Sequence, residues 1–189
     1  MKDKILKVLN EYLLIFPNEN ERQSRFKNYI ENHSYSELVD WNNFDGHLVA
    51  GGFIFSKKEK KFLVLYHKDL EMFLYPGGHV TIEDNNVLEA AKREIIEETG
   101  LENIKELKIS ENEMVPIDID TQIIKANERL NLPAHLHFDF RYLFVVDNIS
   151  DIAIDTEELS EYKWINFNEL KNEPHYGKIT EKIDKLIKI

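Results

Sequence analysis

The sequence predicts an α/β fold of the α+β kind, in which helices cover a mixed sheet. Two short runs rich in Val, Ile, Phe and Leu, HLVAGGFIFS at 47–56 and KKFLVLYH at 60–67, are typical of strands. An internal segment, residues 87–99, carries helix formers throughout, as do the two ends of the chain. Strands interspersed with internal and terminal helices favour a sheet covered by helices. We expect a helical extension over residues 1–45 and a sheet domain over residues 46–189.

The N-terminal extension should contain three helices. Leucines recur at helical spacing along its first segment, and Pro17 follows that segment and ends it. The predicted helices cover residues 3–15, 19–32 and 34–41.

The strands should begin at residue 47. The two apolar runs are separated by a polar turn from Ser56 to Lys60, which predicts a hairpin. The helix at 87–99 is followed by Gly100, a residue that commonly ends helices. Further strands are expected at residues 72–75, 104–109, 114–119, 135–146 and 162–165, and terminal helices at 167–171 and 179–189.

The composition limits the classes of function. The chain has 189 residues, 35 acids against 24 bases, and a formal charge of -11. A field of that sign repels phosphate backbones and anionic membranes, so we expect neither a nucleic-acid nor a membrane partner. The absence of cysteine excludes disulfides, thiolate zinc sites and a cysteine nucleophile, and it favours a cytoplasmic protein. No segment has the roughly 18 uninterrupted apolar residues of a membrane span.

One helix carries three glutamates on one side. At about 100° per residue, Glu94, Glu97 and Glu98 share a face beside the apolar face of the predicted helix. Glutamates three and four residues apart destabilise a helix by about 0.2–0.5 kcal/mol per pair. A hard divalent cation would turn this repulsion into binding, because Mg²⁺ prefers carboxylate oxygens and bridges to phosphates. A solvated acidic face is the alternative.

The residues around these glutamates complete a motif. Pro76-Gly77-Gly78 precedes the helix, and Arg93 is placed to pair with the acids. The stretch resembles the Nudix hydrolase signature: Gly, five residues, Glu, seven residues, Arg-Glu, an aliphatic residue, any residue, Glu-Glu, any residue, Gly and an aliphatic residue. Its second half is matched at every fixed position, by Arg93, Glu94, Ile95, Glu97, Glu98, Gly100 and Leu101.

The first half of the signature departs from this pattern. Five residues separate Gly78 from Asp84, an aspartate in place of glutamate, and eight residues rather than seven separate Asp84 from Arg93. A one-residue insertion in the loop before the helix accounts for the difference. Either Asp84 or Glu83 can then take the role of the first acid.

The resemblance implies a Nudix-type alpha/beta/alpha sandwich over residues 46–189 and a metal-dependent hydrolase. Such an enzyme cleaves a diphosphate linkage, in a nucleoside diphosphate joined to another moiety, by water attack on phosphorus. Mg²⁺ or Mn²⁺ would be the cofactor, and a small nucleotide or nucleotide-like diphosphate the substrate. The general base stays open between Glu94 and an acid outside the signature.

The resemblance also assigns roles by position. Glu97 and Glu98 would be the main metal ligands, together with the backbone carbonyl of Gly77. Glu94 would bind or orient a second metal ion or its water, and Arg93 would hold the glutamates in place.

A second group of polar residues lies on one predicted strand. Residues 135–142 alternate strictly, which places His135, His137, Asp139 and Arg141 on one face of the strand. These four residues, and Tyr75 beside the Pro-Gly-Gly turn, are candidates for substrate binding. Two histidines and a carboxylate could instead bind a transition metal, or form a hydrogen-bonded polar face. His47, His67 and His79 are each more often structural as lone histidines.

An alternative function uses the same fold without catalysis. A Nudix-fold module could sense a nucleotide without turnover, although such a sensor has no need of three intact glutamates. The sequence leaves open the substrate, the choice between Mg²⁺ and Mn²⁺, and the purpose of residues 1–45. That segment could cap the cleft or form the surface of a homodimer.

Overall fold

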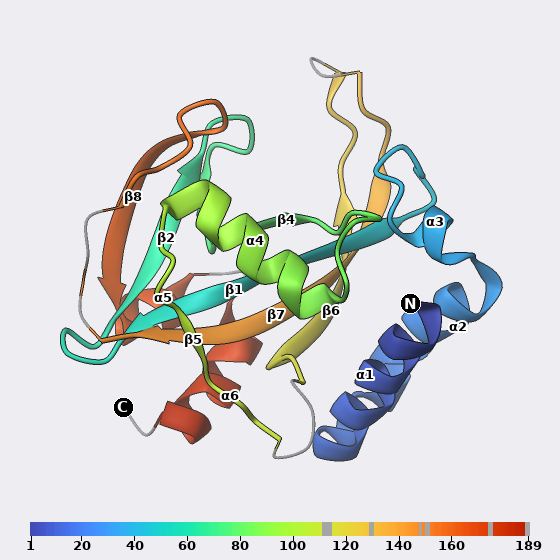
Figure 1. Ribbon diagram of the computed structural model, residues 1–189, viewed down its shortest axis with the longest axis horizontal. Coiled ribbons are helices and arrows are strands. Elements are labelled where there is room, and N and C mark those ends of the chain that lie inside the picture. The colour runs from blue at the N-terminus through green and yellow to red at the C-terminus, as the bar shows by residue number, and fades with distance from the viewer. Residues whose placement is uncertain (111–114, 129–130, 148, 150–151, 174–175, 188–189) are drawn as a thin grey trace.

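A computed structural model describes residues 1–110, 115–128, 131–147, 149, 152–173 and 176–187. Its centre is one mixed sheet of eight strands, with helices packed around it (Figure 1). The strands are β1 (His47–Ser56), β2 (Lys61–His67), β3 (Met72–Leu74), β4 (Gly77–His79), β5 (Lys105–Glu106), β6 (Asp118–Ile124), β7 (His135–Val146) and β8 (Leu159–Asn166). The helices are α1 (Lys2–Ile15), the 3-10 helix η1 (Pro17–Glu19), α2 (Asn20–Asn32), α3 (Tyr35–Leu38), α4 (Val87–Thr99), α5 (Phe167–Asn172) and α6 (Gly177–Ile187).

The parallel pair of β1 and β7 forms the middle of the sheet. Their register runs without interruption from His47 opposite His137 to Ser56 opposite Val146. β2, β3 and β8 extend the sheet beyond β1, β5 and β6 pair with β7, and β4 forms a short antiparallel pair with β1. Every residue of β1 is buried. A parallel strand buried on both faces explains why its sequence is almost continuously apolar.

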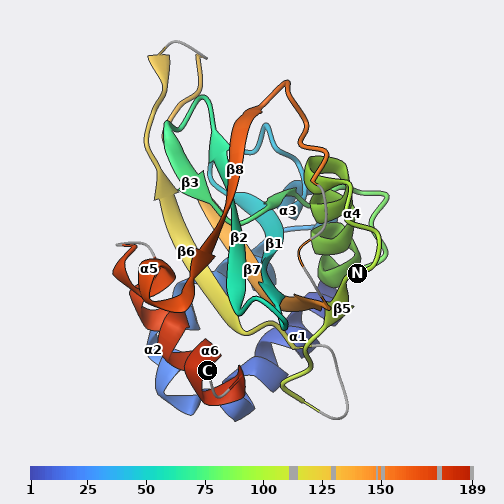
Figure 2. The same cartoon turned by 90° about the vertical axis from the view of Figure 1, so that its left-hand side faces the viewer.

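Two layers of helices cover opposite faces of the sheet. Leu48, Ala50 and Ile54 of β1 belong to one apolar cluster, together with residues of α1, α2 and α4. Phe53 and Phe55 belong to the other cluster, together with residues of α5 and α6. Figure 2 shows α4 and α5 on opposite sides of the strands. This alternation along β1 gives the alpha/beta/alpha sandwich that the resemblance implies.

The N-terminal helices pack against the sheet. Ile5, Leu9 and Tyr12 of α1 are buried in the same cluster as Phe138 of β7, and the ring of Phe26 in α2 stacks on Phe138 with centroids 4.7 Å apart. The first 45 residues therefore share a core with the strands that follow them.

A buried carboxylate connects an N-terminal helix, a C-terminal helix and the sheet. Asp118, at the start of β6, accepts hydrogen bonds from Arg22 Nη2 at 2.8 Å and Lys182 Nζ at 2.7 Å. Arg141 Nη1 of β7 lies 3.3 Å from its other oxygen. Burial alone would raise the pKa of Asp118, but these three cations lower it below its ordinary value. The carboxylate thus joins α2, α6 and the sheet.

Most predicted elements are confirmed, and the differences follow from pairing. The hairpin of β1 and β2, the helix at 87–99 and the long strand at 135–146 lie where the sequence places them. The predicted strand at 104–109 is reduced to two residues, and that at 114–119 is wrong, because β6 begins only at Asp118. Met114 lies outside the described residues. Pro116 has no N–H to donate, so regular pairing with β7 starts after it.

The ends of the predicted helices also shift. The third N-terminal helix covers only Tyr35–Leu38, and the last helix begins two residues earlier than expected, at Gly177. β4 has no counterpart among the predicted strands, because Pro-Gly-Gly is typical of a turn.

Candidate functional site

α4 is fixed at both ends and along one face. The side chain of Asn86 caps its N-terminus by accepting a hydrogen bond from the Glu89 N–H at 3.0 Å. Gly100 ends the helix with φ 68°, a left-handed conformation that glycine adopts without strain. Val87, Leu88, Ala90, Ala91, Ile95 and Thr99 are buried against the sheet. The neighbouring face is thereby turned toward β4 and the loop that precedes the helix.

Arg93 is the centre of the hydrogen-bond network on that face. Its Nη1 donates to Glu94 Oε1 at 2.8 Å and to Glu97 Oε2 at 2.9 Å. Its Nη2 donates to the backbone carbonyl of His79 at 2.9 Å. The guanidinium therefore fixes two of the three glutamates and connects the helix to β4.

Arg93 also contacts an acid of the loop before the helix. Arg93 Nε and Nη2 donate to the two oxygens of Asp84, at 3.0 and 2.9 Å, as a planar bidentate pair. Burial alone would raise the pKa of Asp84, but the bonds from Arg93 and Thr81 lower it. Glu83 is exposed. The structure thus brings Asp84 to the arginine.

Glu98 is held from the opposite side by β4. Its Oε2 accepts a hydrogen bond from the Gly77 N–H at 2.7 Å. Burial raises the pKa of Glu98 to about 8, against the effect of this bond, and the carboxylates of Glu94, Glu158 and Asp155 add to the rise. Burial and the neighbouring carboxylates thus both disfavour the charged form of Glu98 in the metal-free protein.

Gly78 leaves room for another carboxylate. A Cβ atom at this position would lie 2.5 Å from Glu94 Oε2, so any side chain there would displace this carboxylate. Burial is also the main cause of a raised pKa at Glu94, opposed by Arg93. The second glycine of Pro-Gly-Gly therefore lets the Glu94 carboxylate lie against β4.

These features fit a divalent cation. Glu98 accepts a bond from the Gly77 N–H, Glu94 lies beside Gly78, and Arg93 holds Glu94 and Glu97. The pKa values of Glu94 and Glu98 are raised mainly by burial. Oxygen donors of this kind suit Mg²⁺ or Mn²⁺. Metal binding by Glu94, Glu97, Glu98 and Gly77, which the resemblance implies, stays a prediction.

The polar residues of β7 divide into two groups. Asp139 and Arg141 are buried, and Arg141 Nε donates to Asp139 Oδ2 at 3.0 Å and to the Tyr75 hydroxyl at 3.0 Å. The guanidinium of Arg141 also contacts Asp118 at 3.3 Å and Asp120 at 3.1 Å. Arg141 is thus paired with three carboxylates of the protein itself. Substrate contact by these residues stays a prediction.

His135 and His137 belong to a different group. Their Nε2 atoms are 3.1 Å apart, and both rings lie about 5 Å from the ring of His47. His79 lies beside them, with its ring centroid 5.0 Å from that of His47. In the sequence, His47 and His79 are lone histidines. They come together only through strand pairing, which the local sequence does not reveal. His67 lies elsewhere, on β2, with Nε2 3.9 Å from a Glu158 oxygen.

Among the described helices, none has the length and apolar character that a membrane crossing requires.

One curated relative resembles this chain in sequence. It is the "Probable DHNTP pyrophosphohydrolase" of Lactococcus lactis subsp. cremoris (strain MG1363), which is 34% identical over 118 residues. The alignment covers 62% of this chain and 64% of the relative.

Solved structures show the same fold. A NUDIX family hydrolase from Clostridium perfringens has a TM-score of 0.56 with 25% identity, over 74% of this chain and 97% of its own. The E. coli dihydroneopterin triphosphate pyrophosphohydrolase has a TM-score of 0.59 with 15% identity, over 75% and 96% of the two chains. At 15% identity, the latter likeness concerns the fold alone.

A family comparison covers most of the chain. The sequence model of the NUDIX domain matches residues 45–184, which include every strand of the sheet and the helix with the three glutamates. With the signature at Arg93 to Leu101 and the sandwich fold, this match confirms the resemblance seen in the sequence. The chain belongs to the NUDIX domain family.

Proposed function

We propose that the protein hydrolyses a diphosphate linkage in a nucleotide or nucleotide-like substrate with the aid of Mg²⁺ or Mn²⁺. The observation that carries the proposal is the convergence of Glu94, Glu97 and Glu98 around Arg93 and Gly77. The names of the relatives, which are pyrophosphohydrolases and hydrolases, support the same reaction class.

The glutamates and a backbone carbonyl would hold the metal. Glu97 and Glu98 would be its main ligands, with the carbonyl of Gly77 and with Glu94 toward a second ion or its water. The bound metal would offset charge on the phosphoryl oxygens and lower the pKa of a bound water. Arg93 acts through position, because it orients two carboxylates and leaves Glu98 free of any cationic partner among the contacts described above.

Glu94 also suits proton transfer from the attacking water. Its pKa is raised, chiefly by burial. A glutamate with a raised pKa accepts and returns a proton near neutral pH more readily than an exposed glutamate does. Glu94 stays the candidate for the general base inside the signature.

The relative from L. lactis suggests one particular substrate to include in the test. Its printed name suggests a triphosphate of a pterin. The panel should therefore contain dihydroneopterin triphosphate, nucleoside triphosphates, dinucleoside polyphosphates, nucleotide sugars and NADH.

The test is release of phosphate, pyrophosphate or nucleoside monophosphate from this panel with Mg²⁺, with Mn²⁺ and with a chelator. We expect metal-dependent turnover of at least one substrate and its loss in Glu98→Gln. Glu89→Gln is the matched control, because Glu89 is exposed on the same helix and contacts Asn85 instead of the site.

Other outcomes would contradict the proposal. Turnover by Glu98→Gln equal to that of the wild type would exclude this residue as a ligand. No turnover of any compound, with nucleotide binding retained in calorimetry, would support the sensing module.

A further inference from the structure

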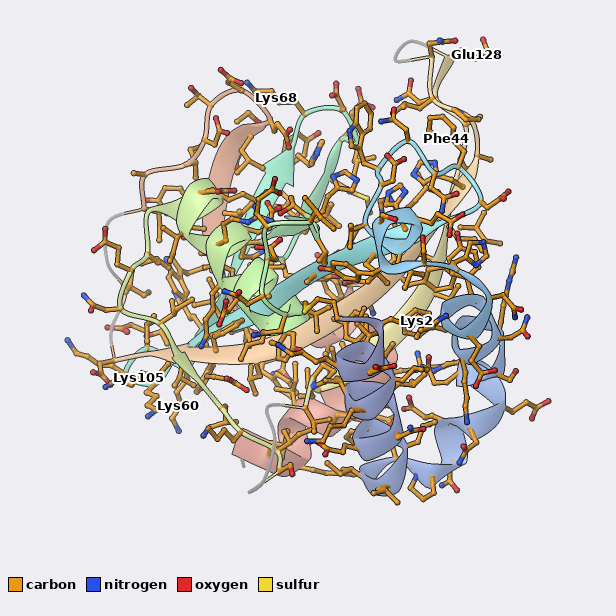
Figure 3. The ribbon with its side chains drawn as sticks, turned by 45° about the vertical axis from the view of Figure 1, so that its right-hand side comes forward. Lys2, Phe44, Lys60, Lys68, Lys105 and Glu128 are labelled. Atoms are coloured by element: carbon orange, nitrogen blue, oxygen red, sulfur yellow. The ribbon has the colours of Figure 1, made fainter. Side chains whose placement is uncertain are left out.

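Four histidines from three strands form a cluster at one end of the sheet. His47 begins β1, His79 ends β4, and His135 and His137 begin β7. Neighbouring ring centroids are 4.7–5.6 Å apart. Figure 3 labels Phe44 close to the hairpin that carries Glu128, and the Phe44 ring meets that of His135 edge-on with centroids 6.0 Å apart.

Strand register explains the cluster. His47 lies opposite His137 in the parallel pair, and His79 lies opposite Val49, two residues beyond His47 on the same face of β1. Gly78 faces Glu94, so the side chain of the next residue, His79, points to the other face of the sheet. The cluster is therefore separated from the three glutamates by the strand itself.

Hydrogen bonds to the backbone set the proton positions on two of the rings. His47 Nδ1 lies 3.3 Å from the carbonyl of Asn43, and His135 Nδ1 lies 2.8 Å from that of Pro133. A carbonyl only accepts, so each Nδ1 carries the proton and each Nε2 has a free lone pair. His47 is 1% exposed, and its Nε2 has no hydrogen-bond partner among the residues that the structure describes.

The two histidines of β7 also share a proton in a way that leaves a free lone pair. Nε2 of His135 accepts from Nε2 of His137 at 3.1 Å, which leaves Nδ1 of His137 with a lone pair. Neutral imidazoles bind metals, whereas protonated ones do not.

We propose that His47, His79 and His137 bind one divalent transition-metal ion of the Zn²⁺ type, with His135 orienting the ring of His137. Each of the three residues offers one nitrogen, and these nitrogens lie within 4.8 Å of one another. In a tetrahedral zinc site the nitrogens are about 3.3 Å apart, given Zn–N bonds of about 2.0–2.1 Å. The rings need to move together by up to about 1.5 Å.

The ligand types decide which metal is bound. Imidazole nitrogen suits Zn²⁺, Co²⁺, Ni²⁺ and Cu²⁺, while Mg²⁺ requires oxygen ligands. Three protein ligands leave one position open to water or another small ligand. His79 is exposed, so an ion can reach the cluster from solvent. The protein would therefore hold two chemically different metals on opposite faces of β4.

The test measures metal content and leaves activity aside. Metal-stripped protein is incubated with Zn²⁺ in the presence of excess Mg²⁺, which saturates the carboxylates, and is then gel-filtered for elemental analysis. A Co²⁺ titration followed by visible absorption gives an independent affinity. We expect one Zn²⁺ per chain and a tetrahedral Co²⁺ spectrum.

Variants separate the cluster from the carboxylate site. His79→Ala should weaken Zn²⁺ binding by more than about 100-fold, and His135→Ala by about 10- to 100-fold, the usual effect of a residue that orients a metal ligand. Two control variants should bind Zn²⁺ like the wild type. One is Glu98→Gln, at the carboxylate site, and the other is His33→Ala, which removes a histidine outside the cluster. Because His79 is exposed, its replacement should leave the thermal melt unchanged.

Two results would overturn the proposal. One is that the wild type retains no Zn²⁺ in excess Mg²⁺. The histidines would then form only a hydrogen-bonded polar face. The other is loss of Zn²⁺ in Glu98→Gln but not in His79→Ala, which would place the ion at the carboxylates. Either result can occur whether or not the protein is a hydrolase.

Discussion

Replacing Glu98 by glutamine should stabilise the metal-free protein while it removes activity. The folded site raises the pKa of Glu98 from its ordinary value of 4.5 to about 8. Between these values the unfolded chain has lost the proton and the folded chain keeps it. The free energy of unfolding therefore falls as pH rises through this window, by up to about 1.4 kcal/mol per pH unit.

The magnitude follows from the same shift. A pKa raised from 4.5 to about 8 corresponds to at most about 5 kcal/mol at pH 8. The Glu98 side chain is partly exposed, so water offsets part of this cost and we expect about 1–3 kcal/mol. Glutamine keeps an oxygen that can accept the bond from Gly77 N–H and has no proton to lose.

The assay is urea unfolding followed by circular dichroism in EDTA at pH 5, 6.5 and 8. Wild type and Glu98→Gln should be nearly equal at pH 5, and the variant should be more stable at pH 8. Added Mg²⁺ should restore stability to the wild type more than to the variant, because a ligand that binds only the folded state stabilises it. A stability difference that does not change with pH, or a variant less stable at pH 8, would refute the reasoning.

Three further substitutions test other parts of the structure. Asp118→Asn should destabilise the fold by about 1.5–3 kcal/mol in urea unfolding, because it removes the buried charge that three cations share, although each of them keeps another acidic partner. Its pKa is lowered in the folded state, so the contribution of Asp118 is present at neutral pH and should disappear as pH falls below about 4. Gly78→Ala should reduce turnover at least about 10-fold, since its methyl group displaces Glu94. Asp84→Asn should reduce turnover by about 10- to 100-fold, because it weakens the bidentate pair that orients Arg93.

Matched controls accompany these variants. Asp120 is half-buried and also contacts Arg22. Asp120→Asn should therefore reduce the free energy of unfolding less than Asp118→Asn does. Glu83→Gln should leave turnover unchanged, since Glu83 is exposed. Equal effects of the Asp84 and Glu83 variants would contradict the assignment of the first acid.

The sequence by itself determined the family and the carboxylate site. The three glutamates and Arg93 lie within one turn and a half of a single helix, and the capping residues and apolar face of that helix are also local. Residues three and four apart on a helix share a face whatever the rest of the fold does. The position of the site could therefore be predicted before any tertiary contact was known.

Contacts between distant segments were decided only by the tertiary structure. His47, His79 and His137 meet because β1 pairs with both β4 and β7, and no local pattern records that pairing. The same holds for Asp118, whose cationic partners come from α2, α6 and β7. A strand pattern tells which face a residue occupies, but the neighbours on that face depend on strand order and register.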